Sequence, residues 1–267
     1  MIGFATKTVI VWMMWLVMAS PALADVGAFL AQVVAAHGGG VTPTAIHARG
    51  MTQSVRRGSG PVERWWQAPD RFRSDIDYPD APESRVLRGN EAWQQGEPAS
   101  AALYGAMVLQ AARMALPWRL QQNAQRLIDN GTQQNSAGKL VRVLEWPVQD
   151  GIKLIVEIDP ETLLILRSRG ILAINNASME FATDYIDYRT VDGRRVAMVE
   201  QHYVMGQFVG ATTFDIVEFP SLLPAPTFDP TPTAAGLSAG VSGTPNSAQR
   251  PLNSGDRFSR KAARPSA

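Results

Sequence analysis

The apolar positions in residues 25–36 recur at the spacing of a helix. They lie three or four residues apart, so one face of an α-helix would carry Val26, Phe29, Leu30, Val33 and Val34. Three glycines follow at 38–40, and glycine commonly ends a helix. We therefore predict a helix over residues 25–36.

Short alternating stretches divided by glycine and proline predict strands after this helix. They cover residues 45–55, 62–67, 72–78 and 84–88. Because the connections are short, the strands should form an antiparallel meander.

Two helices and a second set of strands follow. Residues 99–115 and 118–128 are rich in Ala, Leu, Met and Gln and predict helices broken at Pro117. Strand patterns return at 140–145, 152–158, 163–168, 179–188, 195–205 and 208–217, with an Asp-Gly turn at Asp192. The fold class predicted is α+β, with one large antiparallel sheet.

The strand patterns give the sheet one apolar and one wet face. In residues 72–78, Phe72, Ile76 and Tyr78 share one face, whereas the other carries Arg71, Arg73, Asp75 and Asp77. Met179, Phe181 and Tyr185 repeat the apolar pattern, as do Phe208, Phe214 and Ile216.

Two adjacent tryptophans, Trp65 and Trp66, must point to opposite faces of a strand. We expect Trp66 on the apolar face. Trp65 is then expected on the other face or the rim, where a large exposed aromatic side chain suggests a surface that docks a partner.

Both ends of the chain depart from globular composition. Lys7, the apolar run Val9–Ala19 and the pattern Ala22-Leu23-Ala24 predict a signal peptide over residues 1–24, cleaved before Asp25. From Pro220 onward Pro, Ala, Gly, Ser and Thr dominate, which is typical of disorder. We expect a folded domain over residues 25–228 and a disordered tail over residues 229–267.

Composition limits the function. A net charge of +1 provides no field to attract nucleic acid, and the arginines are interleaved with acids, as on solvated faces. The 267 residues include no cysteine, so disulfides, thiolate metal sites and cysteine nucleophiles are excluded. We expect a monomer outside the cytoplasm that needs no cofactor.

Two motifs together suggest an esterase. His37–Gly40 has the sequence of a lipase oxyanion loop, and Gly236–Gly240 that of a G-x-S-x-G elbow. However, Ser238 lies in the predicted tail, and no histidine follows it, since the last one is His202. We therefore expect no enzyme, and an esterase is only a remote alternative.

Metal chemistry has little support. His37, His47 and His202 lack the spacing of a zinc site, and we expect them on the surface or within strands. The acidic run from Asp75 to Glu83 has Asp80 where a calcium loop needs glycine. It is predicted to be a solvated strand edge.

Several segments resemble the periplasmic outer-membrane lipoprotein-sorting proteins of the LolA and LolB superfamily. They are "ERWWQAPDRFRSDI" (63–76), "RVLRGNEAW" (85–93), "IDPETLLILRSR" (158–169) and residues 184–207. The resemblance implies an unclosed antiparallel half-barrel whose concave face is covered by helices. An apolar cavity between them would hold acyl chains of lipids or lipoproteins.

One position departs from this pattern. The lipoprotein carriers have arginine before the proline that matches Pro69, and Ala68 stands there in this chain. The departure places lipoprotein as the particular cargo in doubt, but not lipid binding. Relatives that sense envelope state imply an alternative, a periplasmic regulator acting through an inner- or outer-membrane protein.

The residues expected to line the cavity combine large aromatic and flexible apolar side chains. They are Trp66, Phe72, Ile76, Tyr78, Leu103, Met107, Met114, Leu116, Trp118, Met179, Phe181, Tyr185 and Phe214. The pattern equally fits a filled core, because Met and Leu stripes on helices are usually core residues.

Overall fold

The computed structural model describes residues 21–174 and 177–230, with side chains from residue 26 onward. Residues 1–20 and 231–267 lie outside the described residues, and so does all of the second of the chain's two units, residues 234–267. The signal peptide and the disordered tail therefore stay predictions.

In the described part of the chain, thirteen strands form one antiparallel sheet. The first six are β1 (Ala45–Ser54), β2 (Gly58–Gln67), β3 (Arg71–Asp77), β4 (Pro82–Arg88), β5 (Glu91–Gln94) and β6 (Glu97–Pro98). The others are β7 (Ile128–Gln134), β8 (Leu140–Gln149), β9 (Ile152–Ile158), β10 (Ile165–Ile174), β11 (Ala177–Val191), β12 (Arg194–Val204) and β13 (Gln207–Glu218).

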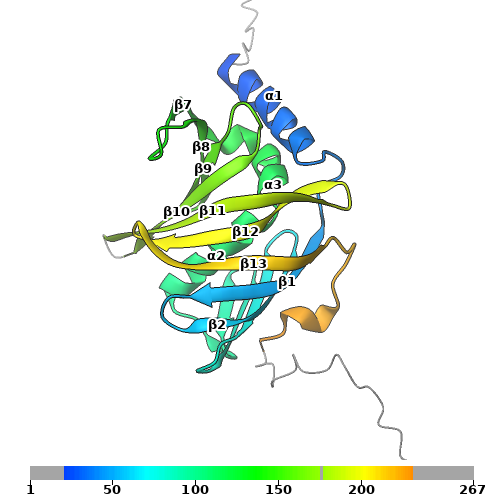
Figure 1. Cartoon of the computed structure of the whole chain (residues 1–267), viewed down its shortest axis with the longest axis vertical. Coiled ribbons are helices and arrows are strands. Elements are labelled where there is room, and N and C mark those ends of the chain that lie inside the picture. The colour runs from blue at the N-terminus through cyan, green and yellow to red at the C-terminus, as the bar shows by residue number, and fades with distance from the viewer. Residues whose placement is uncertain (1–20, 175–176, 231–267) are drawn as a thin grey trace, which may run out of the picture. The chain divides into compact units, whose positions relative to one another are not determined.

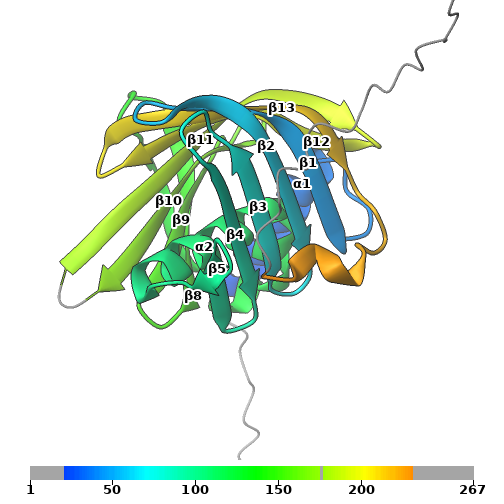
Figure 2. The same cartoon turned by 90° about the horizontal axis from the view of Figure 1, so that it is seen from below.

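Two meanders make up this sheet. β1 to β6 follow one another on one side and β7 to β13 on the other, and the sheet is joined where β1 pairs with β13. The outermost strands, β6 and β7, do not pair with each other, so the sheet curves without closing (Figures 1 and 2). The predicted α+β half-barrel is confirmed.

Three helices accompany the sheet: α1 (Pro21–Ala36), α2 (Ala101–Met114) and α3 (Leu116–Gln122). α2 and α3 follow β6 in the chain and precede β7, so they must connect opposite edges of the sheet. They do so across its concave face, where α1 packs against α3 (Figure 2). The topology therefore places a helical cover over the concave face, as predicted.

The helix boundaries differ from the prediction at two places. α1 begins at Pro21, four residues before the predicted start. α3 ends at Gln122 instead of continuing to residue 128, and a 3₁₀ turn, η1 (Ala124–Arg126), precedes β7. β7 was missed because six of its seven residues are exposed and show no apolar alternation, and β5 and β6 because they are so short.

The glycine that follows α1 is required by close packing. Gly38 has a φ of +100°, and a Cβ there would lie 2.1 Å from the Gly193 carbonyl oxygen in the β11–β12 turn. Any other residue would force the end of α1 away from the sheet. The His37–Gly40 motif thus forms a helix end.

The core lies between the concave face and the helices. Strands and helices both contribute side chains that are almost completely buried, including Trp66, Phe72, Leu87, Leu144 and Leu154 from the sheet and Leu30, Met107 and Leu120 from the helices. Among the described residues, none of the helices has both the length and the apolar character needed to span a bilayer.

Residues 220–230, which composition grouped with the tail, lie against the convex face of the sheet. A short turn, η2 (Ala225–Phe228), places Phe228 with Leu223 over Ala45 and Val86. The side chain of Arg73 donates to the carbonyl oxygens of Thr227 and Asp229, at 3.1 and 3.3 Å. Residues 220–228 therefore pack on the sheet in spite of their proline-rich composition, and Arg73 is buried rather than solvated.

The predicted face of Ile216 is also wrong. A register shift between Arg49 and Gly50 on β1 interrupts the alternation of the paired strand β13. Phe214 is buried on the concave face, but Ile216 is 42% exposed, and Val217 occupies the next buried position. A bulge of this kind moves the side chains that follow it to the other face.

Candidate functional site

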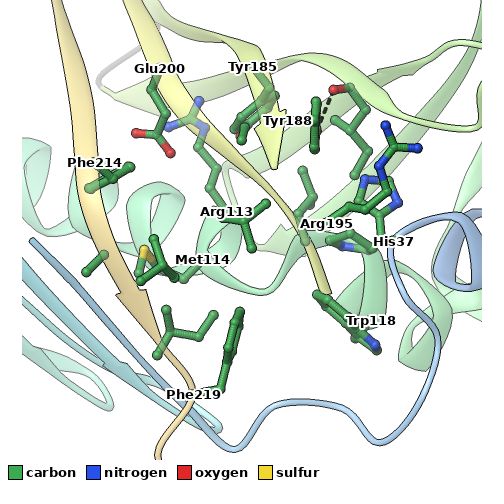
Figure 3. A pocket seen from close by; sticks show the side chains of 18 residues that line it. His37, Arg113, Met114, Trp118, Tyr185, Tyr188, Arg195, Glu200, Phe214 and Phe219 are labelled. Atoms are coloured by element: carbon green, nitrogen blue, oxygen red, sulfur yellow. Dashed lines mark hydrogen bonds between the residues drawn. The ribbon is translucent and has the colours of Figure 1, made fainter. Parts of the chain in front are cut away.

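An apolar hollow lies where α2 meets α3, beneath the helical cover. Its cavity volume is about 90 Å³. The cover contributes Met114, Leu116 and Trp118, while Tyr185, Phe214 and Phe219 face them from the sheet and its last strand end (Figure 3). The wall is therefore formed by flexible and aromatic side chains that are suited to irregular apolar ligands.

A second, polar hollow lies beside it over the middle of the concave face. Its cavity volume is about 320 Å³, and it is lined by Phe72, Ile76, Tyr78 and Phe181 together with Arg64, Gln110 and His202. Arg113, Met114 and Glu200 line both hollows, so the two meet at the carboxyl end of α2.

A buried ion pair forms the sheet side of this junction. Nη1 of Arg64 on β2 donates to Oε2 of Glu200 on β12 at 2.6 Å, and its Nη2 donates to Oγ1 of Thr212 at 3.2 Å. Burial raises the pKa of Glu200, but the charge of Arg64 and its hydrogen bond outweigh it, and the carboxyl stays below its ordinary pKa. Glu200 is therefore an anion that Arg64 holds in place.

His202 stands next to this pair as a neutral ring. Its Nε2 lies 3.0 Å from Oγ1 of Thr212 and 3.8 Å from Oε2 of Glu200. Burial lowers the pKa of His202 to about 4, although Glu200 opposes the shift. The ring therefore adds polarity without charge to the wall at neutral pH.

Arg113, the last but one residue of α2, crosses the junction from the helix side. Its Nε donates to Oγ of Ser168 at 2.9 Å and its Nη2 to the carbonyl oxygen of Phe181 at 2.7 Å. Figure 3 shows it extending toward Glu200 and Tyr185. Burial lowers the pKa of Arg113 and raises that of Tyr185, whose hydroxyl lies 2.8 Å from the Ser168 hydroxyl, to about 12.

The far end of the apolar hollow is closed by His37 and Tyr188. Nδ1 of His37 donates to the carbonyl oxygen of Val33 at 2.8 Å, and the Tyr188 hydroxyl donates to that of Ile165 at 2.8 Å. Burial lowers the pKa of His37 and raises that of Tyr188. Both groups are neutral at pH 7, so neither contributes a charge to this end of the hollow.

Arg119 attaches α3 to the sheet. Its guanidinium lies 5.0 Å from the ring centre of Trp146 and 6.0 Å from that of Trp66, and its Nη1 donates to the carbonyl oxygen of Ala111 at 2.8 Å. Cation–π contacts of this kind stabilise by about 0.5–2 kcal/mol. Burial lowers the pKa of Arg119 to about 10. These contacts hold α3 against the sheet.

The structure divides the predicted cavity residues into three groups. Met114, Leu116, Trp118, Tyr185 and Phe214 line the apolar hollow, and Phe72, Ile76, Tyr78 and Phe181 line the polar one. Trp66, Leu103, Met107 and Met179 line neither. Of these last four, Trp66 and Met107 are fully buried, and Leu103 packs against the core from its edge.

Trp65 lies on the convex face, opposite Trp66, but not as a bare surface. Its ring stacks on His47 with centroids 5.4 Å apart and packs against the cluster that contains Leu223 and Phe228. His47 in turn is bridged to Glu63 and Glu218, at 2.6 and 3.0 Å. The structure thus gives Trp65 intramolecular contacts at the position where docking was predicted.

The acidic run is tied to arginines. Asp75 accepts from Arg73 and Ser84, and Asp80 accepts from Arg57. Glu83 is 7% exposed and pairs with Arg57 and Arg85, so it is buried rather than on a solvated edge. In the described part of the chain, no three His, Asp or Glu side chains are grouped closely enough to hold a metal ion. Ser238 of the esterase motif lies outside the described residues.

Sequence reasoning missed the polar members of the site. Arg64 and Arg113 were assigned to solvated faces, and His37, expected on the surface or in a strand, is 2% exposed after the end of α1. His202 does lie in a strand, β12, but its place in the wall of the polar hollow was not foreseen. The alternation of the strands contained the signal, since Arg64 shares a face with Trp66. No such signal pointed to Arg113 on its helix.

Of three comparisons with known proteins, only that with solved structures gives matches. No protein-family model matches the chain, and no curated protein matches it. The solved structures similar to it include a putative outer membrane lipoprotein-sorting protein domain from Vibrio parahaemolyticus, with 11% identity, a TM-score of 0.46, and coverage of 78% of this chain and 97% of that one.

Two further structures cover a similar share of the chain. A DUF1329 family protein from Desulfovibrio piger has 12% identity and a TM-score of 0.48, with 78% of this chain and 95% of that one covered. A LolA superfamily protein from Nitrosomonas europaea has 10% identity and a TM-score of 0.47, with 74% and 96% covered. The Vibrio and Nitrosomonas proteins bear the names of the group that the sequence motifs resemble.

Proposed function

We propose that this protein is a periplasmic binding or carrier protein for lipid acyl chains, which it holds between the half-barrel and the helical cover. The observation that carries the proposal is the apolar hollow beneath the α2–α3 corner, with Met114, Leu116 and Trp118 on one side and Phe214 on the other. Each methylene buried there would contribute about 0.8 kcal/mol.

The closed hollow is too small for a long chain. Its volume of about 90 Å³ is below the roughly 150 Å³ of an engineered cavity that binds benzene. A bound acyl chain therefore requires the cover to move. We infer that the cover bends at the corner between α2 and α3. There Ala115 has non-helical φ and ψ angles of −121° and 44°, and Pro117 has no N–H to donate to the preceding turn.

The rest of α2 is fixed to the sheet. A Cβ on Gly105 would lie 2.5 Å from Cδ1 of Leu172, and one on Gly170 would lie 2.6 Å from Cδ1 of Leu109. Helix and sheet therefore touch as closely as glycine permits. We infer that α3 moves away from Trp66 and Trp146 while α2 stays in place.

The resemblance in sequence motifs supplies the class of cargo and the compartment. Acyl chains fit the hollow, but Ala68 replaces the arginine of the lipoprotein carriers, so lipoprotein is not proposed as the particular cargo. Cleavage before Asp25 would remove only the first turn of α1 and would leave Val26, Leu30 and Val33 in the core.

The alternative, a regulator that acts through a membrane protein, has no specific support in the fold. Trp65 was its expected docking residue, and it is half-buried against His47 and the segment that contains Phe228. Of the polar groups in the wall, Glu200 is held by Arg64, and His202 lies within hydrogen-bond distance of Thr212.

Binding of a fluorescent fatty-acyl probe tests the proposal. Met114→Glu places a carboxylate in the wall of both hollows, where it must stay hydrated or be protonated, and either outcome opposes hydrocarbon. We expect at least a tenfold loss of affinity with the fold retained. Met51→Glu is the matched control, because Met51 is 46% exposed on β1.

Three readouts separate the outcomes. Native mass spectrometry of the wild-type protein should detect a co-purifying or added lipid, and circular dichroism should show that both variants fold. If the wild-type protein takes up neither lipid nor probe, the carrier proposal is wrong. If Met114→Glu folds and binds as well as Met51→Glu, lipid is not held beneath this corner.

A further inference from the structure

The wall of the two hollows carries more positive than negative charge. Its charged residues at neutral pH are Arg64, Arg85, Arg113, Arg195 and Glu200. Glu200 pairs with Arg64 at 2.6 Å, and Arg85 pairs with Glu83. Within the described residues, Arg113 has no carboxylate within 4.0 Å, although it lines both hollows.

Glu200 attracts Arg113 as well as its own partner Arg64, but one carboxylate cannot balance two guanidinium groups. Tyr185 on β11 has its pKa raised to about 12, and His202 on β12 has its pKa lowered to about 4, so both are neutral at pH 7. An arginine keeps its proton in proteins, and a partly buried cation without a counter-charge is costly. The site therefore has room for one negative charge.

The guanidinium is also held in place. Ser168 and the Phe181 carbonyl accept from Nε and Nη2, which occupies two of its five N–H groups. A Cβ on Gly170 would lie 3.0 Å from Nη2, so the glycine leaves space that a side chain would fill. A group fixed in this way loses little freedom when it binds a ligand.

We propose that the protein selects amphiphiles with an anionic head, a carboxylate or a phosphate, whose negative charge pairs with Arg113. This inference rests on the proposed function and names its ligand class. The acyl chain would enter the apolar hollow directly beside the head, because Arg113 is followed by Met114, whose side chain lines that hollow. Planar N–H donors suit either head group.

The test compares a fluorescent twelve-carbon fatty acid with its methyl ester, which keeps the chain and removes the charge. We expect the wild-type protein to bind the acid about 10- to 100-fold more tightly, the range for a hydrogen bond to a charged group. Arg113→Met should abolish this preference without weakening the ester, and Arg113→Lys should retain most of it.

Arg195→Met is the matched control, because Arg195 lines the same hollow at the end near His37 and is exposed to solvent. It should leave the preference for the acid within about threefold of wild type. If Arg195→Met removes the preference and Arg113→Met does not, the head binds at Arg195 and the inference is wrong.

The remaining outcomes are equally decisive. Equal binding of acid and ester by the wild-type protein overturns the inference and leaves the proposed function intact. Binding of neither probe overturns both. If inorganic phosphate binds but the fatty acid does not, the site takes a free anion rather than a lipid head. If Arg113→Met does not fold, the inference is tested by the ratio of acid to ester affinity in the wild-type protein and in Arg113→Lys.

Discussion

Met107 and Met114 lie seven residues apart on α2 and therefore on the same face of the helix, yet their surroundings differ. Met107 is fully buried in the core, whereas Met114 is partly exposed and lines both hollows. The same side chain thus fills space in the middle of the helix and borders an opening at its carboxyl end.

The sheet beneath the helix accounts for the difference. Near Met107 the helix touches β10 as closely as glycine permits, at Gly105 and Gly170. Beyond Leu109 the helix instead faces the polar residues Arg64, Glu200 and His202, which cannot be packed as densely by apolar groups. An apolar stripe on a helix therefore indicates burial but does not distinguish a core from a cavity wall.

The largest expected effect is that of Met107→Glu. A carboxylate at this fully buried position has no partner and no water, so we expect a loss of about 4 kcal/mol or more in the free energy of unfolding. Urea denaturation followed by circular dichroism measures it. If the variant were as stable as the wild-type protein, the helix could move at Met107, and the surroundings of Met107 and Met114 would be alike.

A smaller effect concerns pH and the polar end. His202 has a folded pKa of about 4 against 6.5 in the unfolded chain, so the unfolded state binds more protons between these values. The contribution of His202 to the free energy of unfolding is greatest above pH 6.5, and it falls by about 1–3 kcal/mol as the pH drops toward 4.

His202→Gln isolates this contribution, because His37 also titrates with a lowered pKa and remains in both proteins. Thermal melts of wild type and variant from pH 7.5 to 4 should show a steeper loss for wild type. Parallel curves would mean that His202 is hydrated in the fold and that the polar wall is open to solvent.

The smallest expected effect is that of Met114→Glu on stability. Its carboxylate can remain hydrated in the hollow next to Arg113, so the free energy of unfolding should change by less than about 1 kcal/mol. The same urea titration as for Met107→Glu measures it. If the free energy of unfolding falls as much as in Met107→Glu, then Met114 is an ordinary core residue like Met107.

Much of the fold could be predicted from local patterns. Strands whose two faces differ, such as β3 with Phe72 and Ile76 on one side, can be recognised in the sequence by the alternation of apolar and polar residues. β7 does not, since most of its residues are exposed, and the bulge opposite Gly50 reversed the expected face of Ile216. In residues 220–228 the packing of two side chains, Leu223 and Phe228, outweighs a composition rich in proline.

The site was predictable only in its apolar half. Large side chains at strand or helix spacing suggested Phe214 and Met114, but the separation of wall from core depends on long-range packing. The charges show this most clearly: Arg64 and Glu200 are 136 residues apart in sequence and form one ion pair. Arg113 gains its role from Ser168 and Gly170 on another element.

The pairing of β1 with β13 has a consequence for the order of folding. His47 and Glu218, hydrogen-bonded across this junction, are separated by 171 residues. A chain synthesised from its amino end can therefore form the first meander early, but it cannot join the two meanders until residue 218 is available. The concave surface is thus assembled last, after translation of the domain is nearly complete, and it stays accessible to chaperones until then.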